Sequence, residues 1–423
     1  MLLCALVFTG AQAEQPDFTD YVSNFDFNRD SETVKAEVTV KTFIDGDTVH
    51  FNVDDRNFES SVLKARFLAV NTPESTGKIE EYGKKAAAFT REKLSMADSI
   101  WIESDNSQWN LDSTSERHLV WVWYRLPGET AYRNLNLEIL QNGLAIASST
   151  ANNRYGTICM NALNQARAMK LNVYSGQQDP DYYYGDAVEL TLRELRTNLA
   201  AYNGMKVAFN GIVTINDSNA VYVESFDEET GMYYGMSVYY GFGLSGAGLN
   251  ILSVGNEVRI VGTVQYYEAG GTWQVSGLTY RMMRPKDPGN IQKLSDGHSP
   301  AYVKTDAETY LSEVVIQGEE AVQTFDYAEL ALATSIEMDD LTVTSVYTTV
   351  DEDSSSRGAL TLTCQSGGHT LYVRTVPLFD AAGNPLTADA FTGKNISVKG
   401  IVDLFKGQYQ VKVFTLDSIT FNN

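Results

Sequence analysis

Cysteine and histidine are both scarce in this chain of 423 residues. It contains three cysteines and four histidines, and the histidines lie far apart in the sequence. Cys4 lies in an apolar run at the N-terminus, while Cys159 and Cys364 are widely separated. This composition excludes a disulfide framework and argues against a zinc site built from cysteine or histidine. Any bound metal is therefore expected to be a hard ion with oxygen ligands.

Long apolar segments are also missing, so the sequence predicts no membrane span. The first 13 residues, MLLCALVFTGAQA, are apolar and end in Ala-Gln-Ala, a pattern typical of a signal-peptide cleavage site. The basic residues that usually open such a leader are absent, and a frayed apolar terminus is the alternative interpretation. We interpret residues 1–13 as a signal-peptide remnant and expect a secreted, extracellular protein with bacterial-type export.

Positive charge is in short supply as well. The chain has 32 Lys and Arg against 54 Asp and Glu, a net charge of −22, which is unusual for a partner of nucleic acid. The excess is uneven: residues 31–178 hold 16 basic and 18 acidic residues, and the rest of the chain holds 16 and 36. Most of the acidity therefore lies outside the segment in which we predict the chemistry.

The residues that are abundant favour a folded, mainly β protein. Hydrophobic residues make up 43% of the chain, 24 residues are tyrosine, and the length suits two to four domains. After a polar lead-in at residues 14–33, alternating apolar residues predict strands and then amphipathic helices up to residue 178. We expect an α+β domain over residues 34–178, in which helices pack on a small barrel.

Two further barrels are predicted downstream, over residues 188–284 and 300–423. The segment 255–264 (GNEVRIVGTV) matches 393–402 (GKNISVKGIV) at a constant offset of 138 residues. A glycine that opens each strand and a second glycine in mid-strand suit a strongly bent barrel strand. Both regions resemble the OB-fold, although another small antiparallel barrel is the alternative.

Two segments near the N-terminus carry the residues that suit phosphodiester chemistry. The first, 44–49 (IDGDTV), contains Asp47, and the second, 66–75 (RFLAVNTPES), begins with an arginine. Asp47, the Asn71 side chain and the Thr72 carbonyl offer hard oxygens that suit calcium. Glu74, after a proline, is placed to activate water, and the Arg66 fork matches a phosphate. Taken singly, each feature has a simpler explanation, such as a hairpin turn or a solvated charge.

These segments occur in the order that is typical of the staphylococcal nuclease family, which the chain resembles over about residues 36–177. Further matching segments are 81–90, 117–122, 134–145 and 162–176. The resemblance implies a calcium-dependent, largely sequence-nonspecific endonuclease acting on DNA and/or RNA. It implies catalytic roles for Arg66, Glu74 and Arg117, calcium ligands at Asp47, Asn71 and Thr72, and a supporting role for Asp45 behind the ligands.

The chain departs from the family pattern at several positions. Asn71 replaces an aspartate, which predicts weaker calcium binding or a changed metal preference. Ser148, Ser149 and Thr150 stand where the family prototype has base-stacking tyrosines, so Trp109 or Tyr155 is the candidate substrate-binding aromatic, unless both only pack. In the second region, candidate stacking residues are Tyr239, Tyr240, Phe242, Tyr266, Tyr267 and Trp273.

Other functions stay open at this point. A catalytically silent protein would keep the fold and bind nucleic acid or a partner, and Asn71 favours this reading. A carbohydrate-binding protein would depend on the two downstream barrels alone. The sequence leaves the oligomeric state and the choice between DNA and RNA undetermined.

Overall fold

The computed structural model describes residues 17–54, 58, 60–114, 116–241, 243–268, 270–317, 322–351, 354 and 356–422. The predicted signal peptide (residues 1–13) and Phe242 lie outside these residues. The chain divides into two compact units, of which the first comprises the residues up to Ser75 and Glu80–Tyr182. The second comprises Thr76–Ile79 and the residues from Tyr183 onward. Every helix within the described residues is too short or too polar to span a bilayer.

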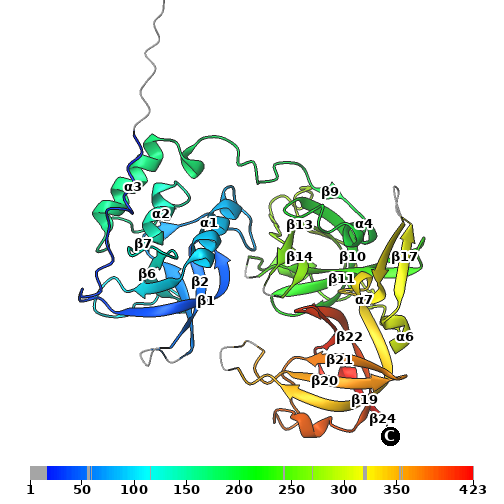
Figure 1. Ribbon diagram of the computed structural model, residues 1–423. Coiled ribbons are helices and arrows are strands. Elements are labelled where there is room, and N and C mark those ends of the chain that lie inside the picture. The colour runs from blue at the N-terminus through cyan, green and yellow to red at the C-terminus, as the bar shows by residue number, and fades with distance from the viewer. Residues whose placement is uncertain are drawn as a thin grey trace, which may run out of the picture. The chain divides into compact units, whose positions relative to one another are not determined.

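The first unit contains a closed five-stranded barrel (Figure 1). Its strands are β1 (Lys35–Asp45), β2 (Thr48–Val53), β3 (Val62–Phe67), β5 (Ser99–Glu103) and β6 (His118–Arg125). β3 and β6 run parallel and close the barrel. Three short strands lie outside it: β7 (Arg133–Asn134) pairs with β6, and β4 (Val70–Asn71) pairs with β8 (Ile146–Ala147).

Three helices pack on this barrel and lie together on one side of it in Figure 1. They are α1 (Gly83–Met96), α2 (Leu135–Gln141) and α3 (Gly156–Ala168), and a 3-10 turn, η1 (Asn172–Tyr174), follows. Asn134 caps α2 by accepting a hydrogen bond from the Leu137 amide at 2.9 Å. All seven residues of α2 are buried, so this helix forms the centre of the helical layer.

The second unit contains two further five-stranded barrels. The strands of the second barrel are β10 (Lys206–Asn216), β11 (Ala220–Asp227), β12 (Met232–Tyr239), β13 (Glu257–Tyr267) and β14 (Thr272–Ser276). Those of the third are β19 (Ser335–Thr348), β20 (Leu360–Ser366), β21 (His369–Thr375), β22 (Asn395–Phe405) and β23 (Gln408–Val413). The short strands β9 (Val188–Glu189) and β15 (Gln292–Ser295) extend the second barrel, and β16 (Val303–Lys304) and β24 (Ile419–Asn422) extend the third.

The remaining elements of the second unit are short. They are the paired strands β17 (Glu313–Gln317) and β18 (Val322–Asp326), the helices α4 (Leu192–Thr197), α5 (Ala247–Ile251), α6 (Ala307–Tyr310) and α7 (Tyr327–Leu330), and the 3-10 turns η2 (Ala388–Ala390) and η3 (Leu416–Ser418). Of the predicted stacking aromatics, Tyr240 is buried, whereas Tyr266 and Tyr267 are exposed. Tyr239 and Trp273 are half-buried.

All three barrels share one topology. Counting the barrel strands alone, the first strand pairs with the second and the fourth, and the third pairs in parallel with the fifth. This order is that of an OB-like barrel. The prediction of a mainly β chain, with one helix-covered barrel and two further small barrels, is therefore confirmed.

The internal sequence repeat corresponds to the fourth strand of the second and third barrels. Gly255 and Gly393 precede these strands with φ of +82° and +75°, a conformation that glycine adopts without strain. At the mid-strand glycines, an added Cβ would lie 2.7 Å from Ser276 O at Gly262 and 2.5 Å from Lys412 O at Gly400. The repeated glycines are therefore required where a bent strand approaches its neighbour closely.

Two charged side chains are buried where the second and third barrels meet. Glu224 of β11 is 1% exposed and accepts hydrogen bonds from the amides of Ser335 (2.7 Å) and Ala301 (2.8 Å). Arg196 of α4 is 5% exposed and donates to the carbonyl oxygens of Gly235 and Leu332. These bonds connect the two barrels within the second unit.

Candidate active site

The turn between β1 and β2 places Asp47 in the interior of the first unit. Asp47 is 0% exposed, and its Oδ2 accepts a hydrogen bond from the Thr72 amide at 2.7 Å. Burial raises the pKa of Asp47, although the Arg66 guanidinium and the hydrogen bond from Thr72 oppose this rise. An added Cβ at Gly46 would lie 2.8 Å from Thr72 Oγ1, so glycine is favoured at this close approach.

Arg66, near the end of β3, connects the two predicted motifs. Its Nη1 forms an ion pair with Asp47, and its Nη2 donates to Asn71 Oδ1. A third, long hydrogen bond runs from Nη1 to Thr48 Oγ1 at 3.4 Å. A guanidinium has five N–H donors, so at least two make no hydrogen bond with a described residue. Those donors are available to bind an anion such as a phosphate.

The turn between β3 and β4 is fixed by hydrogen bonds from distant residues. Ala69 has a φ of +66°, an uncommon conformation for a residue with a Cβ. Its carbonyl accepts from Thr150 Oγ1 at 2.7 Å, and the preceding carbonyl, of Leu68, accepts from Asn136 Nδ2 at 2.9 Å. Residues from α2 and from the loop before α3 thus hold this turn, and with it Asn71, in place.

Glu74 lies after Pro73 and is exposed, and its carboxyl is hydrogen-bonded to that of Asp45. Asp45 is 6% exposed and accepts hydrogen bonds from the Gly46 amide and from Ser75 Oγ, both at 2.8 Å. Burial and then the hydrogen bond with Glu74 raise the pKa of Asp45 to about 8. Asp45 is therefore expected to be protonated at neutral pH.

Arg117 directly precedes β6, whose residue Leu119 pairs with Arg66 in the parallel register. Arg117 Nε donates to Asp112 Oδ2 at 2.7 Å. Burial alone would raise the pKa of Asp112, but hydrogen bonds from Thr114 and Arg117 lower it well below its usual range. In this structure Arg117 is therefore paired with Asp112 and makes no hydrogen bond with another predicted site residue among those described.

An ion pair and hydrogen bonds bring Asp47, Arg66, Asn71 and Thr72 together in the first unit. Residues 64–176 match the family model described as staphylococcal nuclease homologue. The match confirms the resemblance for this segment and supports a nuclease-type or nucleic-acid-binding function. Asp45 and Asp47 lie before the matched residues, and the fold of the nuclease-like domain brings Asp47 to Arg66.

The two aromatic candidates of the nuclease-like domain are engaged in packing. Trp109 lies against Phe58, with ring centroids 5.1 Å apart. Tyr155 precedes α3, and its hydroxyl donates to the buried Glu103 at 3.0 Å. The Tyr155 ring packs against Trp121 with centroids 4.9 Å apart. Both rings are half-buried, and neither lines the cleft beside Arg66.

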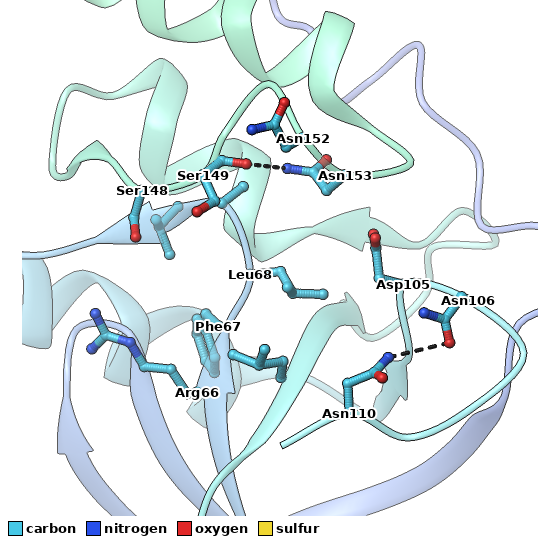
Figure 2. A pocket seen from close by; sticks show the side chains of 13 residues that line it. Arg66, Phe67, Leu68, Asp105, Asn106, Asn110, Ser148, Ser149, Asn152 and Asn153 are labelled. Carbon is cyan, nitrogen blue, oxygen red and sulfur yellow. Dashed lines mark hydrogen bonds between the residues drawn. The ribbon is translucent and has the colours of Figure 1, made fainter. Parts of the chain in front are cut away.

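A cleft of about 330 Å³ begins at Arg66 in the nuclease-like domain. Figure 2 shows Ser148, Ser149, Asn152 and Asn153 on one side, Asp105, Asn106 and Asn110 on another, and Leu68 between them. Sequence reasoning singled out Ser148 and Ser149 but missed Asp105 and Asn152. The missed residues belong to no motif, so only their position in the fold marks them as part of the cleft.

The residues that are expected to hold calcium offer oxygen atoms, which are the ligands that this cation prefers. Asp47 and Asn71 contribute side-chain oxygens, and Thr72 is 2% exposed with a buried hydroxyl that has no hydrogen-bond partner among the described residues. Oxygen donors of this kind suit a hard cation. No group of three or more His, Cys, Asp or Glu with metal-binding geometry occurs in the described part of the chain. The set therefore relies on neutral oxygens besides one carboxylate, which predicts modest affinity.

Proposed function

We propose that this protein is a secreted, calcium-dependent nuclease that hydrolyses phosphodiester bonds of DNA and/or RNA with little overall sequence specificity. The observation that supports it most is that Arg66 joins Asp47 and Asn71 beside an open cleft while keeping free N–H donors. A bidentate guanidinium stabilises the charge that develops on phosphoryl oxygens.

The other predicted catalytic residues complete the proposed mechanism. Glu74, which is exposed after the Pro73 turn, accepts a proton from the attacking water. Arg117 exchanges Asp112 for the phosphate and stabilises the leaving oxygen, because its guanidinium is partly exposed. Substrate binding must therefore compete with two existing carboxylate–arginine pairs.

Calcium held by Asp47, Asn71 and Thr72 would supply positive charge beside the phosphate. The neutral Asn71 lowers the ligand charge, so binding is expected to be weaker than with an aspartate at this position. The Thr72 amide holds Asp47 at 2.7 Å and orients one of its oxygens independently of the cation. Asn71 is oriented by strand pairing of β4 with β8.

Export is proposed from the apolar leader at residues 1–13. Its cleavage after Ala13 would release a protein that begins at Glu14, and degradation of environmental nucleic acid would follow from that location. N-terminal sequencing of the protein recovered from the culture medium tests this. A product that keeps residues 1–13, or that stays in the cell, contradicts the proposal.

The nuclease proposal is tested with residues 14–423 on single-stranded DNA, duplex DNA and RNA, in calcium and in EDTA. Glu74→Gln removes the proton acceptor, and Glu92→Gln on the exposed face of α1 is the matched control. We expect calcium-dependent cleavage that Glu74→Gln abolishes and Glu92→Gln preserves. Cleavage that survives in Glu74→Gln contradicts the assigned role of Glu74.

A catalytically silent binding protein is the second candidate. It is favoured by the pairing of Arg66 with Asp47 and of Arg117 with Asp112, since both arginines already have carboxylate partners. The same preparation distinguishes the two candidates. Retention of DNA on a filter without cleavage under any metal would support the silent protein.

A further inference from the structure

The cleft beside Arg66 lacks an exposed aromatic face. Phe67 is the one aromatic residue that lines it, and this side chain is 2% exposed and belongs to the barrel core. The other lining side chains are mainly amides, hydroxyls and one carboxylate (Figure 2). A base that enters this cleft finds no exposed ring for stacking among the described residues, so hydrogen bonds at its edge would provide the discrimination between bases.

The walls of the cleft are held in fixed positions. Ser149 has a φ of +51°, so two lining residues, Ser149 and Ala69, adopt left-handed backbone conformations. Asn153 Nδ2 donates to the Thr150 carbonyl at 2.8 Å, and Thr150 in turn donates to the Ala69 carbonyl. This chain of bonds ties the loop before α3 to the turn after β3, so the cleft is formed before a ligand arrives.

Asp105 is the only charged side chain opposite Arg66 in the cleft. Its Oδ1 accepts hydrogen bonds from Trp121 Nε1 and from the Arg154 amide, both at 3.1 Å. Its Oδ2 makes no hydrogen bond with a described residue, so this oxygen is available to a ligand. A carboxylate oxygen only accepts hydrogen bonds and therefore discriminates between amino and carbonyl groups. The side chains of Ser148, Ser149 and Asn152 also make no hydrogen bond with a described residue.

We propose that this cleft binds the base of the nucleotide whose phosphate contacts Arg66, and that Asp105 selects bases with an amino group on their pairing edge. The inference rests on the proposed nuclease function and adds base selection at one position. Cytosine offers a 4-amino group to Asp105. Uracil has a carbonyl there, and its single pairing-edge donor lies between two carbonyl oxygens that repel the carboxylate. A site built on hydrogen bonds discriminates, whereas stacking tolerates every base.

The first arm of the test compares kcat/KM on oligo(dC) and oligo(dU) of equal length at pH 8 in calcium. We expect about a tenfold preference for oligo(dC), the effect of one additional hydrogen bond. In Asp105→Asn the remaining carbonyl still accepts from Trp121 and Arg154, and the new NH₂ group takes the place of Oδ2. This variant is expected to lose or reverse the preference, because the amide donates to the uracil carbonyl.

Two further variants keep the test decisive. Asp98→Asn changes an exposed carboxylate that pairs with Arg125 outside the cleft, and it should leave the oligo(dC) preference unchanged. Asn152→Ala, which breaks no hydrogen bond to a described residue, removes a neutral amide from the cleft wall and should also keep the preference, because Asp105 alone sets it. Equal kcat/KM on both polymers, with normal cleavage, overturns base selection and leaves the nuclease proposal intact.

The second arm separates base selection from catalysis. Binding of cytidine and uridine 3′,5′-bisphosphates to the wild-type chain is measured by calorimetry, which needs no turnover. If no polymer is cut under any metal, the nuclease proposal fails. Tighter binding of the cytidine compound would then still support selection by the cleft, and equal binding or no binding would overturn it.

Discussion

The first barrel and the two barrels of the second unit share one strand topology but use their charged residues in opposite ways. In the first, Arg66 pairs with the buried Asp47 and lines a cleft, and at least two of its N–H donors bind no described residue. In the second unit, Glu224 and Arg196 are almost fully buried and bond to backbone groups across the barrel interface. The first barrel therefore has a charged side chain, Arg66, at a cleft, whereas the charged side chains Glu224 and Arg196 connect the second and third barrels.

This difference shows that the topology fixes where loops emerge, and the loop residues decide what they do. Asp47 and Glu224 both lie on or beside the strands of five-stranded barrels. Asp47 pairs with the guanidinium of Arg66, which lines a cleft, whereas Glu224 accepts hydrogen bonds from backbone amides. Net charge follows the same division. Residues 31–178 hold 16 basic and 18 acidic residues, whereas the rest of the chain is strongly acidic and expected to repel phosphate.

The largest expected difference between the first barrel and the second unit is in the effects of substituting Arg66 and Arg196. Arg66→Ala is expected to lower kcat/KM for DNA about a thousandfold, because charge stabilisation at the phosphate is lost. Arg196→Ala should leave kcat/KM unchanged and lower the Tm of the second unit, since two buried carbonyls lose their donor. Cleavage rates and thermal unfolding of both variants provide the comparison. Loss of activity in Arg196→Ala would show that the barrels are functionally coupled.

Truncation of Glu224 should have the next largest effect. Glu224→Ala leaves the amides of Ser335 and Ala301 without an acceptor, which is expected to cost about 3 kcal/mol of unfolding free energy. Glu224→Gln keeps one acceptor oxygen and the volume, so its cost should be about 1 kcal/mol. Urea unfolding of the full chain measures both. Equal losses in the two variants would contradict a hydrogen-bonding role.

The raised pKa of Asp45 predicts that the free energy of unfolding of the first unit depends on pH. This pKa is raised from 3.8 to about 8, so the folded unit holds a proton that the unfolded chain releases. This stabilisation is fully present below pH 3.8 and is lost as the pH rises through about 8. In EDTA the free energy of unfolding should fall by about 1.4 kcal/mol per pH unit between these limits. Asp45→Asn, measured by urea unfolding at several pH values, should flatten the slope.

The smallest expected change concerns calcium. Asn71→Asp adds an anionic ligand beside Asp47, so the calcium concentration for half-maximal cleavage should fall about fivefold. Asn161→Asp, on the exposed face of α3 and outside the cleft lining, serves as the control for added charge. An unchanged calcium dependence in Asn71→Asp would place the cation elsewhere in the first unit.

The sequence alone determined the class of fold and the central motif. Alternating apolar residues and turn glycines act over a few positions, so the strands and the repeat at residues 255–264 and 393–402 could be predicted. The family resemblance depended on 44–49 and 66–75, which are short and local. These are features in which neighbouring residues interact directly, and for that reason they can be read from one chain.

Only the tertiary structure determined which loops meet. Asp105 and Asn152 are far apart in the sequence and line one cleft, because the closure of the barrel and the packing of α3 bring their loops together. In the same way, the tertiary structure places Tyr155 against Glu103 and Trp121, so its side chain packs in the domain. It also places the Glu74 carboxyl beside Asp45. Contacts of this kind depend on the closed path of the whole chain, and no local spacing encodes them.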